Sequence, residues 1–396
     1  MKTPAVEAPI ADICLLLEGT WPYVRGGVSS WVNQLILGLP ELTFSVFFIG
    51  GQSGAYGKRQ YAIPANVVHI EEHFLENAWK PGDAVVAAKR EGPRQLMRDM
   101  HVFLHHPDEP SLEQGQAMLE NLANGAMSLD DVLHSRANWE AITEGYVRHC
   151  SDPSFVNYFW TLRTMQAPLV MLAEAARKLP RARMLHSIST GYAGLLGSIL
   201  QHRWKCSYVI SEHGIYTKER KIDLAQANWI SESPDEMLRT GLDAEVNYIR
   251  RLWIRFFERI GLLAYRSADP IIALYGGNRT QQINDGADPA RTRVIPNGIS
   301  MEAWKDAMQQ RPEGIPKVVG LIGRVVPIKD VKTFIRAMRG VISAIPEAEA
   351  WVVGPEEEDP EYAQECHNLV LSLGLEGKVK FLGFRRIHEL LPSLGM

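Results

Sequence analysis

The sequence predicts an α/β protein with two doubly wound parallel-sheet domains, the second of them incomplete. Two stretches of the chain alternate short apolar runs with segments of helical period, the pattern of parallel strands joined by crossover helices. A loop-rich stretch with Pro and Gly, residues 296–316, separates them. The 396 residues are enough for two domains of ordinary size. We therefore expect an N-terminal domain over residues 1–300 and a C-terminal domain over residues 301–396.

The first domain opens with a strand, a Gly-rich turn, a helix and a second strand. Their predicted ranges are Ile13–Leu17, Val28–Leu39 and Phe44–Ile49. The alternation then stops over residues 71–180, which have a helical pattern and are rich in His, Trp and charged residues. We interpret residues 71–180 as a helical insertion within the first domain.

Strand–helix alternation resumes after the insertion. The expected elements are strand Met184–Ser187, helix Tyr192–Trp204, strand Ser207–Ser211, helix Glu245–Arg266, and strands Pro270–Leu274 and Arg293–Ile295. In the second domain they are strand Val318–Gly323, helix Val331–Ile345, strand Ala350–Gly354, helix Tyr362–Leu373, strand Val379–Gly383 and a last helix, Ile387–Leu394. Three strands make a thin sheet for a doubly wound domain.

Composition excludes several classes of protein. The net charge of −4 argues against a general nucleic-acid-binding or polybasic membrane surface. The four cysteines have no metal-binding spacing, so reduced thiols are expected. There is no signal-peptide pattern and no apolar run long enough to span a bilayer. We expect a cytoplasmic protein, held at the inner membrane only through partners.

The turn between the first strand and the first helix is a candidate anion site. Arg25, Gly26 and Gly27 precede the helix, where backbone N–H groups and the positive end of the helix dipole meet a ligand. An ordinary tight turn is the alternative.

A second candidate anion site follows the first strand of the second domain. Arg324 offers a forked set of donors and Lys329 a point charge, both suited to a diphosphate. The alternative is a solvated basic pair beside a helix capped at Asp330. The chain contains no Asp-x-Asp, so the usual carboxylate–metal–diphosphate site is missing and metal-independent binding is expected.

Two further polar clusters follow predicted strands. Residues 212–214 place His213 at a strand end, where it can orient a substrate hydroxyl, and His186 has a similar but weaker position. A structural histidine is the alternative for both. Residues 356–359 form an acidic loop that contacts a sugar hydroxyl or, alternatively, is simply solvated.

Taken together, these residues resemble the retaining GT-B glycosyltransferases of family 4. The similarity includes residues 296–299, 351–354 and 379–383. The more specific segments, residues 18–31 and 213–220, resemble the PelF branch, the cytoplasmic glycosyltransferases of Pel exopolysaccharide synthesis. This resemblance implies two Rossmann-like domains facing a cleft, with the acceptor received on the N-terminal side.

The resemblance also implies a reaction. A hexose or N-acetylhexosamine passes from a UDP-sugar to a growing polysaccharide with retention of configuration, without metal, and the product passes to an inner-membrane export complex. The implied catalytic residues are His213, near the transferred sugar, and Arg324 and Lys329, on the leaving diphosphate. The implied donor-binding residues are Gly26, Gly27, Arg324, Lys329, Gly354 and Phe384.

One feature departs from the family. Family 4 enzymes carry Glu-x7-Glu in the C-terminal lobe, and this motif does not follow residue 394 here. We therefore expect a truncated C-terminal lobe. One alternative function is that of an inactive binding or scaffold protein of the polysaccharide-synthesis complex. A GT-B sugar-nucleotide epimerase is a third hypothesis, which the resemblance to PelF disfavours.

Overall fold

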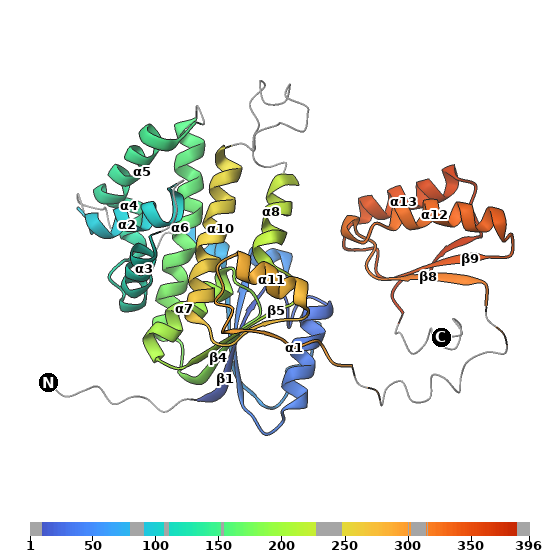
Figure 1. Ribbon diagram of the computed structural model, residues 1–396, viewed down its shortest axis with the longest axis horizontal. Coiled ribbons are helices and arrows are strands. Elements are labelled where there is room, and N and C mark those ends of the chain that lie inside the picture. The colour runs from blue at the N-terminus through green and yellow to red at the C-terminus, as the bar shows by residue number, and fades with distance from the viewer. Residues whose placement is uncertain are drawn as a thin grey trace. The chain divides into compact units, whose positions relative to one another are not determined.

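The computed structural model describes residues 10–79, 91–106, 111–151, 154–226, 248–299, 301, 314 and 316–385. The chain divides into two compact units, Met1–Asn297 and Gly298–Met396. Each unit has its own parallel sheet and its own hydrophobic core (Figure 1). The prediction of an α/β fold with a large first sheet and a thin second sheet is confirmed.

The first unit is built on a parallel sheet of seven strands. In chain order the strands are β1 (Ala11–Glu18), β2 (Phe44–Gly50), β3 (Val67–Phe74), β4 (Ala182–Ser187), β5 (Ser207–Glu212), β6 (Ile271–Ala273) and β7 (Thr292–Val294). They lie in the order β3-β2-β1-β4-β5-β6-β7. The order reverses between β1 and β4, the position at which doubly wound sheets bind ligands.

Both faces of β1 are covered, which explains its nearly continuous apolar sequence. Ile13, Leu15 and Leu17 point to the face packed by α1 (Gly27–Gly38). Cys14 and Leu16 point to the other face and join a core with α7 (Tyr192–Trp204) and α10 (Tyr248–Ser267). Two further helices of this unit are α8 (Tyr216–Gln226) and α11 (Gly276–Asn284).

The helical insertion packs on the face of α7 and α10 and extends the same core (Figure 1). Its helices are α2 (Arg94–His105), α3 (Leu112–Asn124), α4 (Leu129–His134), α5 (Arg136–His149) and α6 (Phe155–Lys178). Ser side chains cap the N-termini of α3, α4, α5 and α6. The short 3-10 helices η1 (Ser53–Ala55) and η2 (Leu75–Trp79) precede the insertion.

The predicted start of the insertion at residue 71 is wrong. Residues 71–74 belong to β3, which pairs with β2 at the edge of the sheet. An edge strand tolerates polar residues, and His69, Glu71 and His73 break the apolar pattern by which a strand is recognised. Residues 245–247 of the predicted helix Glu245–Arg266, and the predicted helix Ile387–Leu394, lie outside the described residues.

The second unit has a three-stranded parallel sheet in the order β10-β9-β8. Its elements are β8 (Val318–Ile322), η4 (Pro327–Lys329), α12 (Val331–Ala344), β9 (Glu349–Val353), α13 (Pro360–Ser372) and β10 (Val379–Phe381). Its core joins α12 and α13 to the inner face of β9. Asp330 caps α12 by accepting from the backbone N–H of Thr333, as its sequence position predicts.

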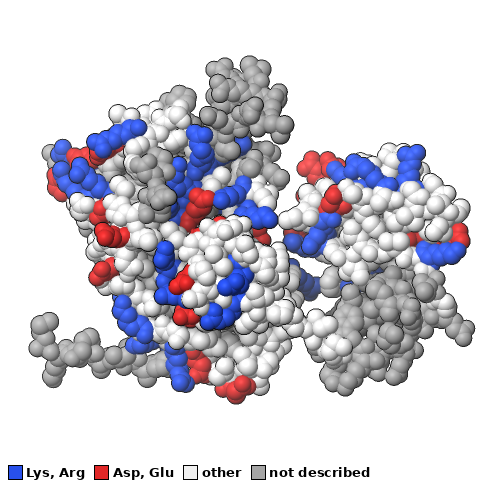
Figure 2. All heavy atoms as spheres, viewed as in Figure 1, with Lys and Arg blue, Asp and Glu red and all other residues white. Residues whose placement is uncertain are grey.

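The surface carries both signs of charge. On the face drawn in Figure 2, basic and acidic side chains are interspersed, in keeping with the small net charge of −4. Within the described segments, no helix combines the length and apolar character needed to cross a bilayer.

Candidate functional site

The candidate site of the first unit lies at the carboxyl ends of β1, β4 and β5. A cavity of about 470 Å³ is lined there by Glu18, Thr20, Val28, His213 and Tyr216, among others. Glu18 ends β1, His213 follows β5, and Val28 belongs to the first turn of α1. The sheet topology thus brings the Gly-rich turn and the His213 segment to one cavity.

Glu18 connects three elements around this cavity. Its Oε1 accepts from the Tyr216 hydroxyl at 2.6 Å, and its Oε2 accepts from the Ala193 backbone N–H at 3.2 Å. Ala193 lies in the first turn of α7, which has neither a side-chain cap nor an acidic residue of its own. A carboxylate from β1 therefore interacts favourably with the positive end of the α7 dipole.

Glu212 is a fully buried carboxyl at the end of β5. Its Oε2 accepts from the Tyr265 hydroxyl at 2.6 Å and from Gln282 Nε2 at 3.0 Å, and its Oε1 accepts from the Thr190 hydroxyl at 3.1 Å. Burial raises its pKa, an effect that these hydrogen bonds oppose. Glu212 joins β5 to α10 and α11, so we assign it a structural role beneath the cavity.

His213 presents a hydrogen-bond donor. Its Nδ1 lies 3.4 Å from Asn297 Nδ2, which donates to it, so the proton of the neutral ring is on Nε2. Nε2 is buried and has no partner among the described residues. Burial lowers the pKa of His213, and Trp31 contacts the ring edge-on at 4.7 Å between centroids. A neutral imidazole with a free N–H fits the predicted role of orienting a substrate oxygen.

His186 is buried, and its Nε2 lies 2.8 Å from the Ser211 hydroxyl. Burial, with a smaller effect of nearby His213, lowers its pKa to about 4. The structural alternative therefore describes His186 better than a catalytic role does.

The lowered pKa of His186 predicts a pH dependence of stability. The stabilisation is complete above the unfolded pKa of about 6.5 and is lost as the pH falls through about 4. The shift corresponds to a loss on the order of 3 kcal/mol in the free energy of unfolding. His186→Gln should flatten this dependence in urea titrations from pH 7 to 4, whereas the exposed control His134→Gln should not. Parallel pH curves for wild type and His186→Gln would contradict the prediction.

Gly26 and Gly27 lie at the start of α1. A Cβ built on either residue would have no atom within 4 Å, and neither backbone is left-handed. Packing and conformation therefore do not require glycine here. The first turn of α1 has no acidic residue and no side-chain cap, so its N–H groups are open to an anion.

The second unit places its predicted residues at the carboxyl edge of its sheet. Arg324 follows β8 and forms an ion pair with Glu358 of the acidic loop. Lys329 ends η4, and its side-chain carbons lie beside Gly323. The N-terminus of α12 is already capped by Asp330, so a diphosphate here must rely on Arg324 and Lys329 rather than on this helix.

Gly354 has a packing role that the sequence did not reveal. A Cβ at Gly354 would lie 1.8 Å from the carbonyl oxygen of Gly323. Its N–H donates to the carbonyl of Gly383 at 3.0 Å, immediately before the half-exposed Phe384. Gly354 thus holds the ends of β8, β9 and β10 together, and its contact with a donor stays a prediction.

The acidic loop is held by contacts within the unit. Glu356 lies 2.7 Å from His367 Nε2, Glu358 pairs with Arg324, and Asp359 caps α13 through the Tyr362 N–H. Glu357 is exposed, and its Oε2 accepts from the Glu356 N–H within the loop. A contact of Glu356 or Glu357 with a ribose or sugar hydroxyl stays a prediction.

The pair Arg324–Glu358 predicts competition with an anionic ligand. Glu358→Gln should strengthen the binding of UDP about threefold to tenfold. In wild type, Arg324 must give up its ion pair with Glu358 before it can bind a phosphate, and the variant removes this cost. Calorimetric titration with UDP measures this. Glu361→Gln, in the first turn of α13, is the control. Weaker binding by Glu358→Gln would show that Glu358 positions Arg324 instead of competing for it.

Sequence reasoning did not assign roles to Glu18, Trp31 and Tyr216, although all three lie in segments that it singled out, residues 18–31 and 213–220. Trp31 contacts both His186 and His213, with centroid separations of 5.8 and 4.7 Å. The signal available in the sequence was their position at strand and helix ends. Their mutual contacts depend on the strand order, which the sequence does not state.

Comparisons with known proteins define the class. Residues 303–394 match the family model described as Glycosyl transferases group 1. With two parallel α/β units, the chain has the GT-B fold of group 1 glycosyltransferases. Residues 11–290, well over half of the chain, match the model described as Domain of unknown function (DUF3492), so the chain belongs to the DUF3492 family.

The chain is also similar to several solved structures. HepE of Anabaena in complex with UDP is 16% identical, with a TM-score of 0.50, over 96% of this chain and 71% of that chain. A glycosyltransferase of Rickettsia africae is 11% identical, with a TM-score of 0.46, over 98% and 71%. The lipopolysaccharide outer core galactosyltransferase WaaB is 10% identical, with a TM-score of 0.44, over 96% and 70%. No curated protein matches the chain.

Proposed function

We propose that this chain is a PelF-like glycosyltransferase of family 4. It transfers a hexose or N-acetylhexosamine from a UDP-sugar to a growing exopolysaccharide, with retention of configuration. The observation that carries the proposal is the grouping of Arg324 and Lys329 at the carboxyl edge of the β8–β10 sheet, within the segment that matches group 1 glycosyltransferases. The UDP bound to HepE supports UDP as the nucleotide part of the donor.

The reaction exchanges one bond at the anomeric carbon of the sugar for another. The bond between the anomeric carbon and the diphosphate oxygen breaks, and the acceptor hydroxyl oxygen bonds to the same face of that carbon. Its proton passes to the departing diphosphate. In the second unit, Arg324 and Lys329 stabilise the charge that develops on the diphosphate without a metal. In the first unit, the N-terminus of α1 at Gly26 and Gly27 offers neutral backbone donors to an anion. His213 donates through Nε2 to a sugar oxygen and keeps the transferred sugar in place.

The proposal extends to location and partners. The protein acts in the cytoplasm, and an export complex of the inner membrane receives its polysaccharide product. Glu18 and Tyr216 shape the cavity beside His213, on the side where the acceptor is expected. Phe384, half-exposed after β10, is the proposed contact for the base.

Calorimetric titration of the chain with UDP, with ADP as the control, tests the proposal. Selective binding of UDP supports it, and product analysis by NMR after incubation with UDP-hexoses then reports the anomeric configuration. Activity that persists in EDTA supports metal independence. A folded chain that binds no UDP would overturn the enzymatic proposal in favour of the scaffold alternative.

A further inference from the structure

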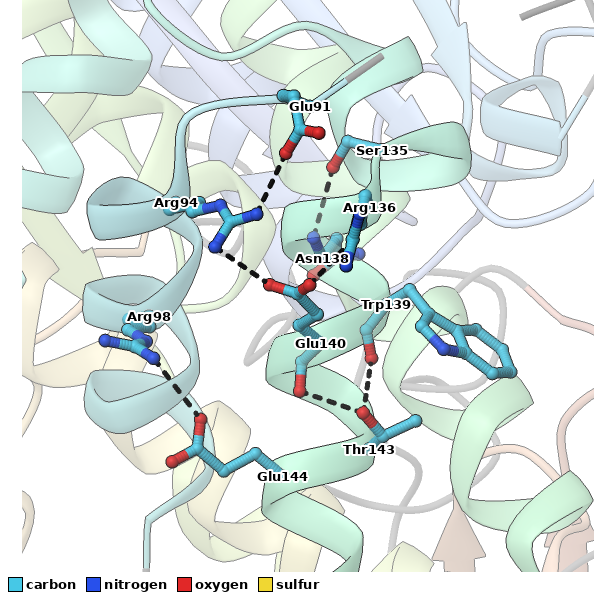
Figure 3. Close-up of polar contacts among 10 residues, drawn as sticks. All are labelled: Glu91, Arg94, Arg98, Ser135, Arg136, Asn138, Trp139, Glu140, Thr143 and Glu144. Atoms are coloured by element: carbon cyan, nitrogen blue, oxygen red, sulfur yellow. Dashed lines mark hydrogen bonds and ion pairs between the residues drawn. The ribbon is translucent and has the colours of Figure 1, made fainter. Parts of the chain in front are cut away.

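The four arginines of α2 and α5 all have carboxylate partners. Figure 3 shows the pairs formed by Arg94, Arg98 and Arg136, with the Trp139 ring projecting away from them. The pairs are Arg94–Glu91 at 2.9 Å, Arg94–Glu140 at 3.5 Å, Arg136–Glu140 at 2.8 Å, Arg98–Glu144 at 3.9 Å and Arg148–Glu144 at 2.8 Å. Ion pairing thus neutralises the arginines of these two helices.

Arg163 on α6 is an exception. Its Nε is buried without a partner, and its guanidinium forms no ion pair within the described ranges. Burial lowers its pKa, and no neighbouring carboxylate opposes that effect. The guanidinium carbon lies 4.7 Å above the ring of Phe159, which holds the side chain in place. A partly desolvated cation that lacks a counter-charge is costly, and an anionic ligand would remove this cost.

Arg163 lines a cavity of about 610 Å³ together with Trp139 and Ser135. Glu91 and Arg136 also line it, but their charges are already paired with Arg94 and Glu140. Trp139 is 49% exposed, although the edge-on contacts to Phe155 and Phe159, both at 5.7 Å between centroids, fix its ring. A rigid, half-exposed indole presents an electron-rich face, against which the weakly positive C–H bonds of a pyranose ring pack well. The volume suits a ligand of one or two sugar units.

We propose that this cavity binds an acidic saccharide, a pyranose carrying one carboxylate or phosphate, with the anion on Arg163 and the sugar ring against Trp139. The charge argument comes from the missing counter-ion of Arg163, and the sugar argument from the exposed, fixed indole beside it. The site is made by α4, α5 and α6 and uses none of the residues proposed to bind the donor. It therefore does not depend on the proposed transferase activity.

The full chain, without UDP, is titrated calorimetrically with four probes: glucuronate, glucose 6-phosphate, glucose and inorganic phosphate. The proposal expects at least one acidic sugar to bind at least tenfold more tightly than both glucose and phosphate. The two acidic sugars distinguish a carboxylate from a phosphate as the anion. Equal affinities for the acidic sugars and glucose, binding of phosphate as tight as that of an acidic sugar, or no binding at all would overturn the proposal.

Substitutions test whether Arg163 and Trp139 bind the acidic sugar. Arg163→Gln should weaken the acidic sugar at least tenfold, and Trp139→Ala should weaken it by a similar factor. The matched control Arg98→Gln removes an arginine that is already paired with Glu144 and should leave the affinity unchanged. If Arg163→Gln binds as tightly as wild type, the site assignment is wrong.

A measurement on the wild-type chain avoids any effect of substitution on folding. Phenylglyoxal modifies accessible arginines, and mass spectrometry reports the extent at each position. A saturating concentration of the acidic sugar should slow the modification of Arg163 at least threefold and leave that of Arg98 unchanged. Unchanged modification of Arg163 in the presence of bound sugar would contradict the proposed contact.

Discussion

Replacing Arg324 with alanine should weaken the binding of UDP about 100-fold, which is about 2.8 kcal/mol. Two effects add in the same direction. The diphosphate loses a charge-assisted, forked donor, and Glu358 loses its cation and remains as an uncompensated negative charge beside the phosphates. Transfer from a UDP-sugar should fall at least as much, because the leaving group is less stabilised.

The matched control is Arg336→Ala on the exposed face of α12. It removes the same charge from the same unit without touching the strand ends, so it should change UDP affinity less than twofold. The double variant Arg324→Ala/Glu358→Gln should recover part of the lost affinity. Equal UDP affinity in wild type and Arg324→Ala would remove the central support for a diphosphate site at this edge.

Glu212→Ala should lower the free energy of unfolding of the first unit by about 3–5 kcal/mol. The substitution leaves the donors of Tyr265, Gln282 and Thr190 without their acceptor inside a packed core. Urea unfolding followed by circular dichroism measures the change. Glu258→Ala, an exposed carboxylate on α10 that pairs with Lys221, should cost less than 1 kcal/mol.

Glu212→Gln separates the charge from the hydrogen bonds. Because burial raises the pKa of Glu212, the stability that the protonated carboxyl contributes is complete below about pH 4.5 and is lost as the pH rises through the raised pKa. The glutamine side chain does not titrate. The stability of wild type relative to Glu212→Gln should therefore fall as the pH rises from 4 to 7, and a constant difference would refute the raised pKa.

Most of the fold could be predicted from local pattern. β1 and β2 are almost entirely buried, so their apolar runs stand out in the sequence, and α12 shows a clean helical period with an Asp cap. β3 was missed because its polar positions suit an edge strand and break the apolar alternation. Whether a strand lies at the edge or in the centre of a sheet decides how many polar residues it tolerates, and local pattern does not give that position.

The candidate sites, too, could be predicted from the sequence only in part. Strand ends with Gly, Arg or His could be singled out because parallel sheets bind ligands there. The pairing of Arg324 with Glu358, the close approach of Gly354 to Gly323 and the contact of Trp31 with His213 join residues that the sequence keeps apart. Each depends on which strands and helices are neighbours. The missing counter-ion of Arg163 depends on the packing of α4, α5 and α6 and has no sequence signature.

The separate hydrophobic cores of the two units have a consequence for heat denaturation. Each buried cluster of the described residues lies within one unit, so each unit is expected to melt in its own transition, and a single midpoint does not describe the chain. A small molecule raises the midpoint of the unit that it contacts. A melting curve therefore identifies the unit that binds a ligand. An acidic sugar should raise the midpoint of Met1–Asn297, and a nucleotide held by Arg324 should raise that of Gly298–Met396.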